Sequence, residues 1–223
     1  MTGIKHHLND ALLMAYSAGT LPEAFSLVVA THISMCDDCR AALAAHDAVG
    51  GALLEDTAEV ELAPEALDKC LAAIQALPPK GPIKLPKSMT NGAAPRSSVF
   101  PSPLAEYVQG DVEDVNWRSV GLGVRQAILP TSKEASVRLL YIPAGAEVPD
   151  HGHHGTELTL VLQGAFRDEF DRFGPGDIEV ADPNVEHTPV AEAGEACICL
   201  AATDAPLKFR SILPKIAQPF LRI

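Results

Sequence analysis

Hydrophobic residues recur every three or four positions over residues 1–77, which is the spacing of one face of an α-helix. Thr20 and Glu23 are typical of a capping box and predict the start of a helix. The expected helices cover residues 9–17, a segment beginning at Thr20, residues 38–54 and a segment after Pro64. This part of the chain is therefore predicted to be a small all-α domain.

The hydrophobic pattern changes in residues 104–223. Short runs either alternate between apolar and polar residues or are continuously apolar, and turn residues separate them at roughly regular intervals. The clearest runs are residues 137–142, 157–162, 177–180 and 196–201. Evenly spaced short strands favour an all-β sandwich or a closed barrel.

Residues 78–103 fit neither pattern. They hold seven prolines, two glycines and four cations, with no acidic residue, a composition typical of a semi-extended linker. We therefore expect a helical domain over residues 1–77, a Pro-rich linker over 78–103 and a β domain over 104–223.

The charge excludes several functions. The 223-residue chain has a net charge of −12, with −8 in residues 1–77 and −8 in residues 104–223, whereas direct binding of nucleic acid requires clustered cations. No apolar run approaches the roughly 18 residues of a membrane span, and the amino-terminal residues lack the apolar core of an export signal. We expect a cytoplasmic protein with no direct contact to nucleic acid or membrane.

The helical part contains the pattern His32-x3-Cys36-x2-Cys39. Thiolates and imidazole are ligands that zinc prefers, and a structural zinc site has four ligands. His6 or His7 can supply the fourth ligand if the amino-terminal segment folds back. A domain of this size is also short of apolar core, so a metal would stabilise it.

With a histidine near the start of the chain, this pattern resembles the zinc-binding anti-sigma domain. The resemblance implies His7 as the fourth ligand, and it implies a 1:1 complex with an extracytoplasmic-function, RpoE-like sigma factor. The apolar stripe of the last helix is the surface we expect to bind this partner. Its residues are Leu67, Leu71, Ile74 and Leu77.

The β part contains a second group of metal-ligand residue types. His151 and His153 share one face of an extended strand, Glu157 follows after a short turn, and His187 comes from a later strand. Three imidazoles and a carboxylate suit a divalent transition metal: zinc, or alternatively manganese, iron or nickel.

This spacing resembles the two cupin motifs, which implies a double-stranded β-helix, or jelly roll. The resemblance is incomplete, because no asparagine follows His187 at the usual place. Cys197 and Cys199 lie on one face of a later apolar strand. They are either packed in the core or able to react with an oxidant near the metal.

Together, the zinc domain, the linker and the cupin resemble the ChrR-type anti-sigma factors. The resemblance implies a protein without catalytic residues, which releases its sigma factor on an oxidative signal such as singlet oxygen or an organic peroxide sensed through the cupin. The alternative is a metal-dependent cupin dioxygenase with an accessory zinc domain.

Overall fold

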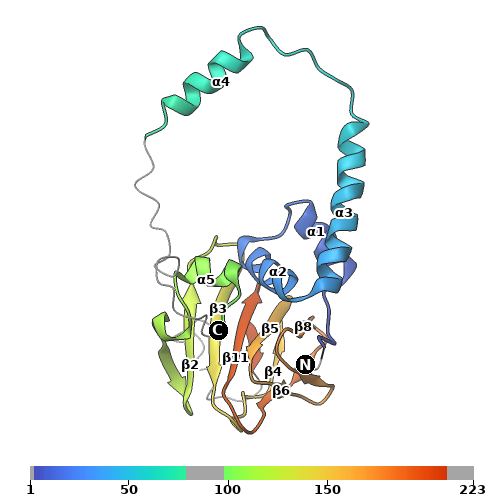
Figure 1. Ribbon diagram of the computed structural model, residues 1–223. Helices are drawn as coiled ribbons and strands as arrows, with labels where there is room; N and C mark the ends of the chain where they lie inside the picture. Colours follow the sequence, from blue (N-terminus) through green and yellow to red (C-terminus); the bar gives the residue numbers. More distant parts are fainter. Residues whose placement is uncertain (1–2, 79–97, 210–223) are drawn as a thin grey trace.

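The computed structural model describes residues 3–78 and 98–209 (Figure 1). Most of the predicted linker, residues 79–97, lies outside the described residues. The α-helices of the described part are α1 (Asp10–Ser17), α2 (Glu23–Met35), α3 (Asp37–Glu55), α4 (Ala66–Gln75) and α5 (Ser102–Val108), followed by the 3₁₀ turn η2 (Val112–Asp114). The predicted helical amino-terminal part is confirmed.

Side-chain caps mark the beginning of α1 and α3, but not of α2, α4 or α5. The Asn9 carboxamide accepts a hydrogen bond from the Leu12 N–H and caps α1. The capping box predicted for α2 is wrong: Thr20 donates its hydroxyl to the Ala15 carbonyl instead. The Glu23 carboxylate accepts a hydrogen bond from the hydroxyl of Tyr107, which lies in α5. This bond connects the helical part to the rest of the protein.

The β part consists of antiparallel strands in three sheets. The order in the largest sheet is β1 (Arg118–Gly121), β2 (Val124–Leu129), β3 (Ser136–Ile142), β11 (Cys197–Thr203), β5 (Glu157–Gln163) and β8 (Ile178–Ala181). The second sheet is β10 (Val190–Ala191), β6 (Phe166–Arg167) and β7 (Arg172–Phe173). The third is β12 (Leu207–Phe209), β4 (His151–His153) and β9 (Glu186–His187).

Both faces of the central strands are covered, which accounts for their continuously apolar sequence. Leu158 and Leu160 of β5 belong to one core together with α2, whereas Val161 belongs to a second core with Cys197 and Cys199. Helix α2 packs against β11, β5 and β3 as well as against α5. The helical and β parts therefore share one apolar core.

The last residues of the predicted linker belong to the folded structure. Phe100 is buried, and α5 begins at Ser102. In contrast, α4 stands apart from the other helices and from the sheets (Figure 1). Among the helices of the described residues, none combines the length and apolar character needed to cross a membrane.

Candidate metal centres

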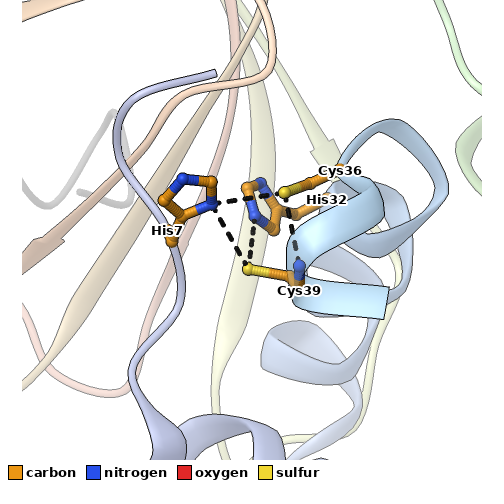
Figure 2. A group of neighbouring side chains, drawn as sticks. All are labelled: His7, His32, Cys36 and Cys39. Atoms are coloured by element: carbon orange, nitrogen blue, oxygen red, sulfur yellow. Dashed lines mark hydrogen bonds between the residues drawn. The ribbon is translucent and has the colours of Figure 1, made fainter. Parts of the chain in front are cut away.

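Four side chains of the helical part converge on one point. The ligand atoms of His7, His32, Cys36 and Cys39 all lie within 4.8 Å of one another (Figure 2). His32 Nε2 is 3.2 Å from Cys39 Sγ, and His7 Nδ1 is 3.2 Å from Cys36 Sγ and 3.7 Å from Cys39 Sγ. Tetrahedral zinc, with bonds of about 2.0–2.3 Å, holds its ligand atoms about 3.3–3.8 Å apart. The cluster has the composition and the size of a structural zinc site.

A break between two helices positions these ligands. Cys36 is at once the residue that ends α2 and the residue that caps α3, where its Sγ accepts from the Cys39 N–H. His32 lies in the last turn of α2 and Cys39 in the first turn of α3. The two helix ends therefore supply three ligand atoms from one corner.

The structure separates the two adjacent histidines. His7 lies in the cluster, whereas the His6 ring turns toward the β part, with Nε2 3.0 Å from Asp171 Oδ2 and Nδ1 3.5 Å from Asp177 Oδ1. His7 is thus the histidine of this pair that can serve as the fourth ligand.

Burial favours the neutral forms of two members of the cluster, His32 and Cys39. It lowers the pKa of His32 to about 4, although the hydrogen bond to the Gly176 carbonyl acts in the opposite direction. That bond, 3.0 Å long, places the proton on Nδ1 and leaves Nε2 facing Cys39. Burial likewise raises the pKa of Cys39 to about 11, so zinc must displace the proton of this thiol.

The second cluster lies inside the β part, where β4 pairs with β9 and sets His151 opposite His187. The ligand atoms of His151, His153 and His187 lie within 4.8 Å of one another, and all three side chains are buried. His151 Nε2 and His187 Nε2 are 3.2 Å apart. Neither ring nitrogen of His153 has a hydrogen-bond partner within the described part of the chain. A buried imidazole without a hydrogen-bond partner destabilises the fold. The position of His153 is therefore explained if its ring binds a metal ion.

Glu157 lies beside this cluster and not within it. Its Oε2 is 3.8 Å from His153 Nδ1, while its Oε1 accepts from the Thr159 hydroxyl. The structure therefore brings three of the four predicted ligands together and places the fourth next to them. His154, between the ligands in sequence, is exposed.

Two carboxylates that the sequence reasoning missed contact His187. Its Nδ1 lies 2.9 Å from Glu179 Oε1 and 3.1 Å from Asp168 Oδ2. Burial lowers the pKa of His187, but these two carboxylates outweigh it and raise the pKa to about 9. They fix the Nδ1 proton and direct Nε2 toward the cluster, which is the usual support of a metal-bound histidine. The sequence signal that could have identified Glu179 is the presence of an acidic residue inside the apolar run 178–181.

Cys197 and Cys199 are both buried, and their sulfur atoms lie 3.5 Å apart. The hydrogen bond with Cys197 and burial raise the pKa of Cys199 well above its ordinary value. Since the thiolate is the reactive form, both facts make Cys199 a slow nucleophile in this conformation. Their redox role stays a prediction.

The predicted partner-binding stripe is exposed on α4 and just beyond it. Leu67 is 69% exposed, Ile74 59% and Leu77 67%, and Leu71 is also exposed. Cys70 is exposed as well. The reason is that α4 buries none of its residues. An unsupported apolar helix face of this kind is typical of an interaction surface.

Comparison with known proteins assigns the chain. Residues 106–206 match the family model described as the ChrR cupin-like domain. The chain is 62% identical over 220 residues to the anti-sigma-E factor ChrR of Cereibacter sphaeroides, covering 99% of both proteins. A solved structure of Rhodobacter sphaeroides SigE in complex with the anti-sigma ChrR matches with 59% identity and a TM-score of 0.76, over 90% of this chain and 99% of that one. A protein of this kind is a regulator and not an enzyme. With its helical part, its β part and both side-chain clusters, the chain belongs to the ChrR family of anti-sigma factors.

Proposed function

We propose that this protein is a cytoplasmic anti-sigma factor that binds an RpoE-like extracytoplasmic-function sigma factor in a 1:1 complex and keeps it from transcription. The observation that carries the proposal is the 62% identity to an anti-sigma-E factor over nearly the whole chain. The solved complex of a 59% identical protein with its sigma factor supports the same partner class.

In this proposal residues 1–77 hold the sigma factor and residues 104–223 sense the signal, with 78–103 between them. Zinc, held by His7, His32, Cys36 and Cys39, fixes the corner between α2 and α3. Because residues 1–77 carry a charge of −8, they complement the basic surface with which a DNA-binding partner contacts phosphates. The exposed leucines and isoleucine of the α4 stripe complement an apolar groove on that partner.

In the second site we propose a divalent metal, zinc or alternatively manganese, iron or nickel, held by His151, His153 and His187 with Glu157 beside them. Singlet oxygen or an organic peroxide would act at or near this site and cause release of the sigma factor.

Co-expression with a candidate RpoE-like sigma factor tests the proposal. The two chains should purify as a 1:1 complex, and the anti-sigma chain should contain zinc. If the sigma factor were soluble and active but this protein eluted separately from it, the result would contradict the proposed function.

The zinc affinity of the helical site should depend on pH through Cys39. Its pKa of about 11 means that the thiol is protonated at neutral pH, so each pH unit gained makes the thiolate about tenfold more available. His32, with a pKa of about 4, adds no proton competition in this range. Chelator competition at pH 7, 8 and 9, corrected for the chelator's own protonation, should give an affinity that rises at least about tenfold per unit. A zinc affinity that does not change with pH would contradict the assignment of Cys39 as a ligand that must lose a proton to bind zinc.

His153→Ala should separate sensing from binding. Removal of this buried imidazole, whose ring nitrogens have no hydrogen-bond partner among the described residues, is expected to empty the cupin site while zinc and sigma binding in the helical part persist. The complex should then no longer dissociate on exposure to singlet oxygen. His154→Ala is the matched control, because the neighbouring side chain is exposed and should respond as wild type does. Normal release from the His153 variant would refute a sensing role for this site.

A further inference from the structure

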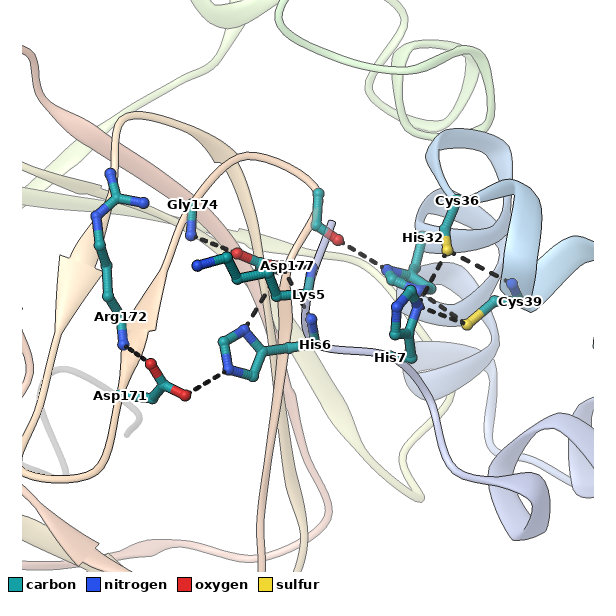
Figure 3. Close-up of polar contacts among 11 residues, drawn as sticks. Lys5, His6, His7, His32, Cys36, Cys39, Asp171, Arg172, Gly174 and Asp177 are labelled. Carbon is teal, nitrogen blue, oxygen red and sulfur yellow. Dashed lines mark hydrogen bonds and ion pairs between the residues drawn. The ribbon is translucent and has the colours of Figure 1, made fainter. Parts of the chain in front are cut away.

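The amino-terminal residues Ile4–His7, which we call the strap, lie along a segment of the β part. The N–H groups of Lys5 and His6 donate to Asp177 Oδ1 over 2.6 and 3.0 Å (Figure 3). In return, the Ile178 N–H donates to the His6 carbonyl over 3.3 Å. The strap is thus hydrogen-bonded by its backbone to residues about 170 positions later in the chain.

Gly176 permits the strap to approach so closely. It has a φ of +90°, and a Cβ there would stand 2.6 Å from Ile4 Cδ1. Its carbonyl also bonds His32 Nδ1. Two consecutive residues of the β part, Gly176 and Asp177, therefore contact both histidine-bearing segments of the helical zinc cluster.

Asp177 is a buried carboxylate that the cupin cluster does not use. Besides the strap, it accepts the Gly174 N–H at Oδ2 over 2.8 Å. Burial raises the pKa of Asp177, but the N–H groups of Gly174, Lys5 and His6 outweigh this and hold it below the ordinary range. The residue is therefore a fixed anion that pins the strap.

His7 depends on this pinning. It follows His6 directly and lies on a segment with no helix or strand of its own, so contacts of the neighbouring backbone decide where its Nδ1 stands relative to the two thiols. We propose that Asp177, from the cupin part, is a positioning residue of the helical zinc site: it holds the strap and so keeps His7 beside Cys36 and Cys39. This inference rests on the zinc site proposed above.

The segments that hold the strap also carry the carboxylates around His187. Asp177 stands two residues before Glu179, and Asp171, which contacts the His6 ring, stands three residues after Asp168. Because Asp177 belongs to the β part, retention of zinc in the helical part depends on both parts of the chain.

The test uses the full-length, zinc-loaded protein and a colorimetric zinc chelator. Asp177→Ala should release zinc from the helical site about 10-fold faster than wild type, the lower end of what loss of outer-shell support costs. Lys5→Pro, which removes one N–H donor and leaves the β part intact, should also accelerate release. Asp177→Asn keeps one oxygen that can accept from the strap but sets an amide N–H against the Gly174 N–H, so it should restore slow release only in part. Alkylation of Cys36 and Cys39, followed by mass spectrometry, assigns the lost zinc to this site.

Asp111→Ala is the matched control, because Asp111 pins the backbone of Val99 and Phe100 in the same way, in another part of the molecule. It should leave zinc release unchanged. After cobalt exchange, Asp177→Ala should shift the ligand-field bands toward those of His7→Ala, a change that general destabilisation does not produce. Wild-type release from Asp177→Ala, or equal acceleration in the Asp111 variant, would overturn the inference. A wild-type protein without zinc at Cys36 and Cys39 would overturn the proposed site itself.

Discussion

Replacing Cys39 with serine is expected to remove zinc from the helical site and to weaken sigma binding by about 100-fold or more. Cys39 is buried in the first turn of α3, and its sulfur lies within 3.2–3.7 Å of His32 and His7. A serine hydroxyl is a poor zinc ligand, and structural zinc contributes on the order of 10 kcal/mol to small domains. Without it, the corner between α2 and α3 is expected to open.

Zinc content and sigma affinity, measured on the same preparation by metal analysis and calorimetry, check this expectation. Cys70→Ser is the control for the zinc measurement, because that thiol is exposed and far from the zinc ligands in sequence; it should keep its zinc. A Cys39→Ser protein that binds the sigma factor as tightly as wild type would show that the zinc is not needed for inhibition.

The double substitution Leu71→Asp with Ile74→Asp is expected to weaken sigma binding by about 100-fold or more while zinc stays bound. Each change removes an apolar anchor and places a charge where the partner would bury it, and central anchors of an interface typically contribute about 2 kcal/mol or more each. Folding should be unaffected, because no residue of α4 is buried. The loss of helix propensity is at most about 1 kcal/mol for the pair.

Calorimetry against the purified sigma factor measures this effect, and circular dichroism and metal analysis verify the fold. Leu122→Asp is the matched control: this leucine is 86% exposed but lies on the β part, so its replacement should not change the affinity. If the double variant bound as wild type does, the α4 stripe would not be the partner surface.

Features that depend on local sequence could be predicted. The helical and β parts differ in apolar period, and His32, Cys36 and Cys39 are close enough in the chain that spacing alone brings them together. His151 and His153 share a face because they alternate along one strand, as expected. In each case the contact lies within a few residues, where backbone geometry decides it.

Features that depend on distant contacts could not be predicted. The choice between His6 and His7 depends on contacts with Asp171 and Asp177, about 170 residues away. The apolar periodicity of α2 predicts a helix, but it carries no information on which elements cover the apolar face. In the structure, β11, β5 and α5 pack against this helix. Phe100, at the end of a Pro-rich segment, falls in the predicted linker because a single buried aromatic residue leaves no periodic pattern.

Transcription in vitro tests the central claim most directly. A purified RpoE-like sigma factor, its core polymerase and a matching promoter are titrated with the zinc-loaded protein. The account predicts that transcription falls to background near one equivalent of protein per sigma factor, and that singlet oxygen restores it. Undiminished transcription at a large excess of protein, with the sigma factor still free, would contradict it.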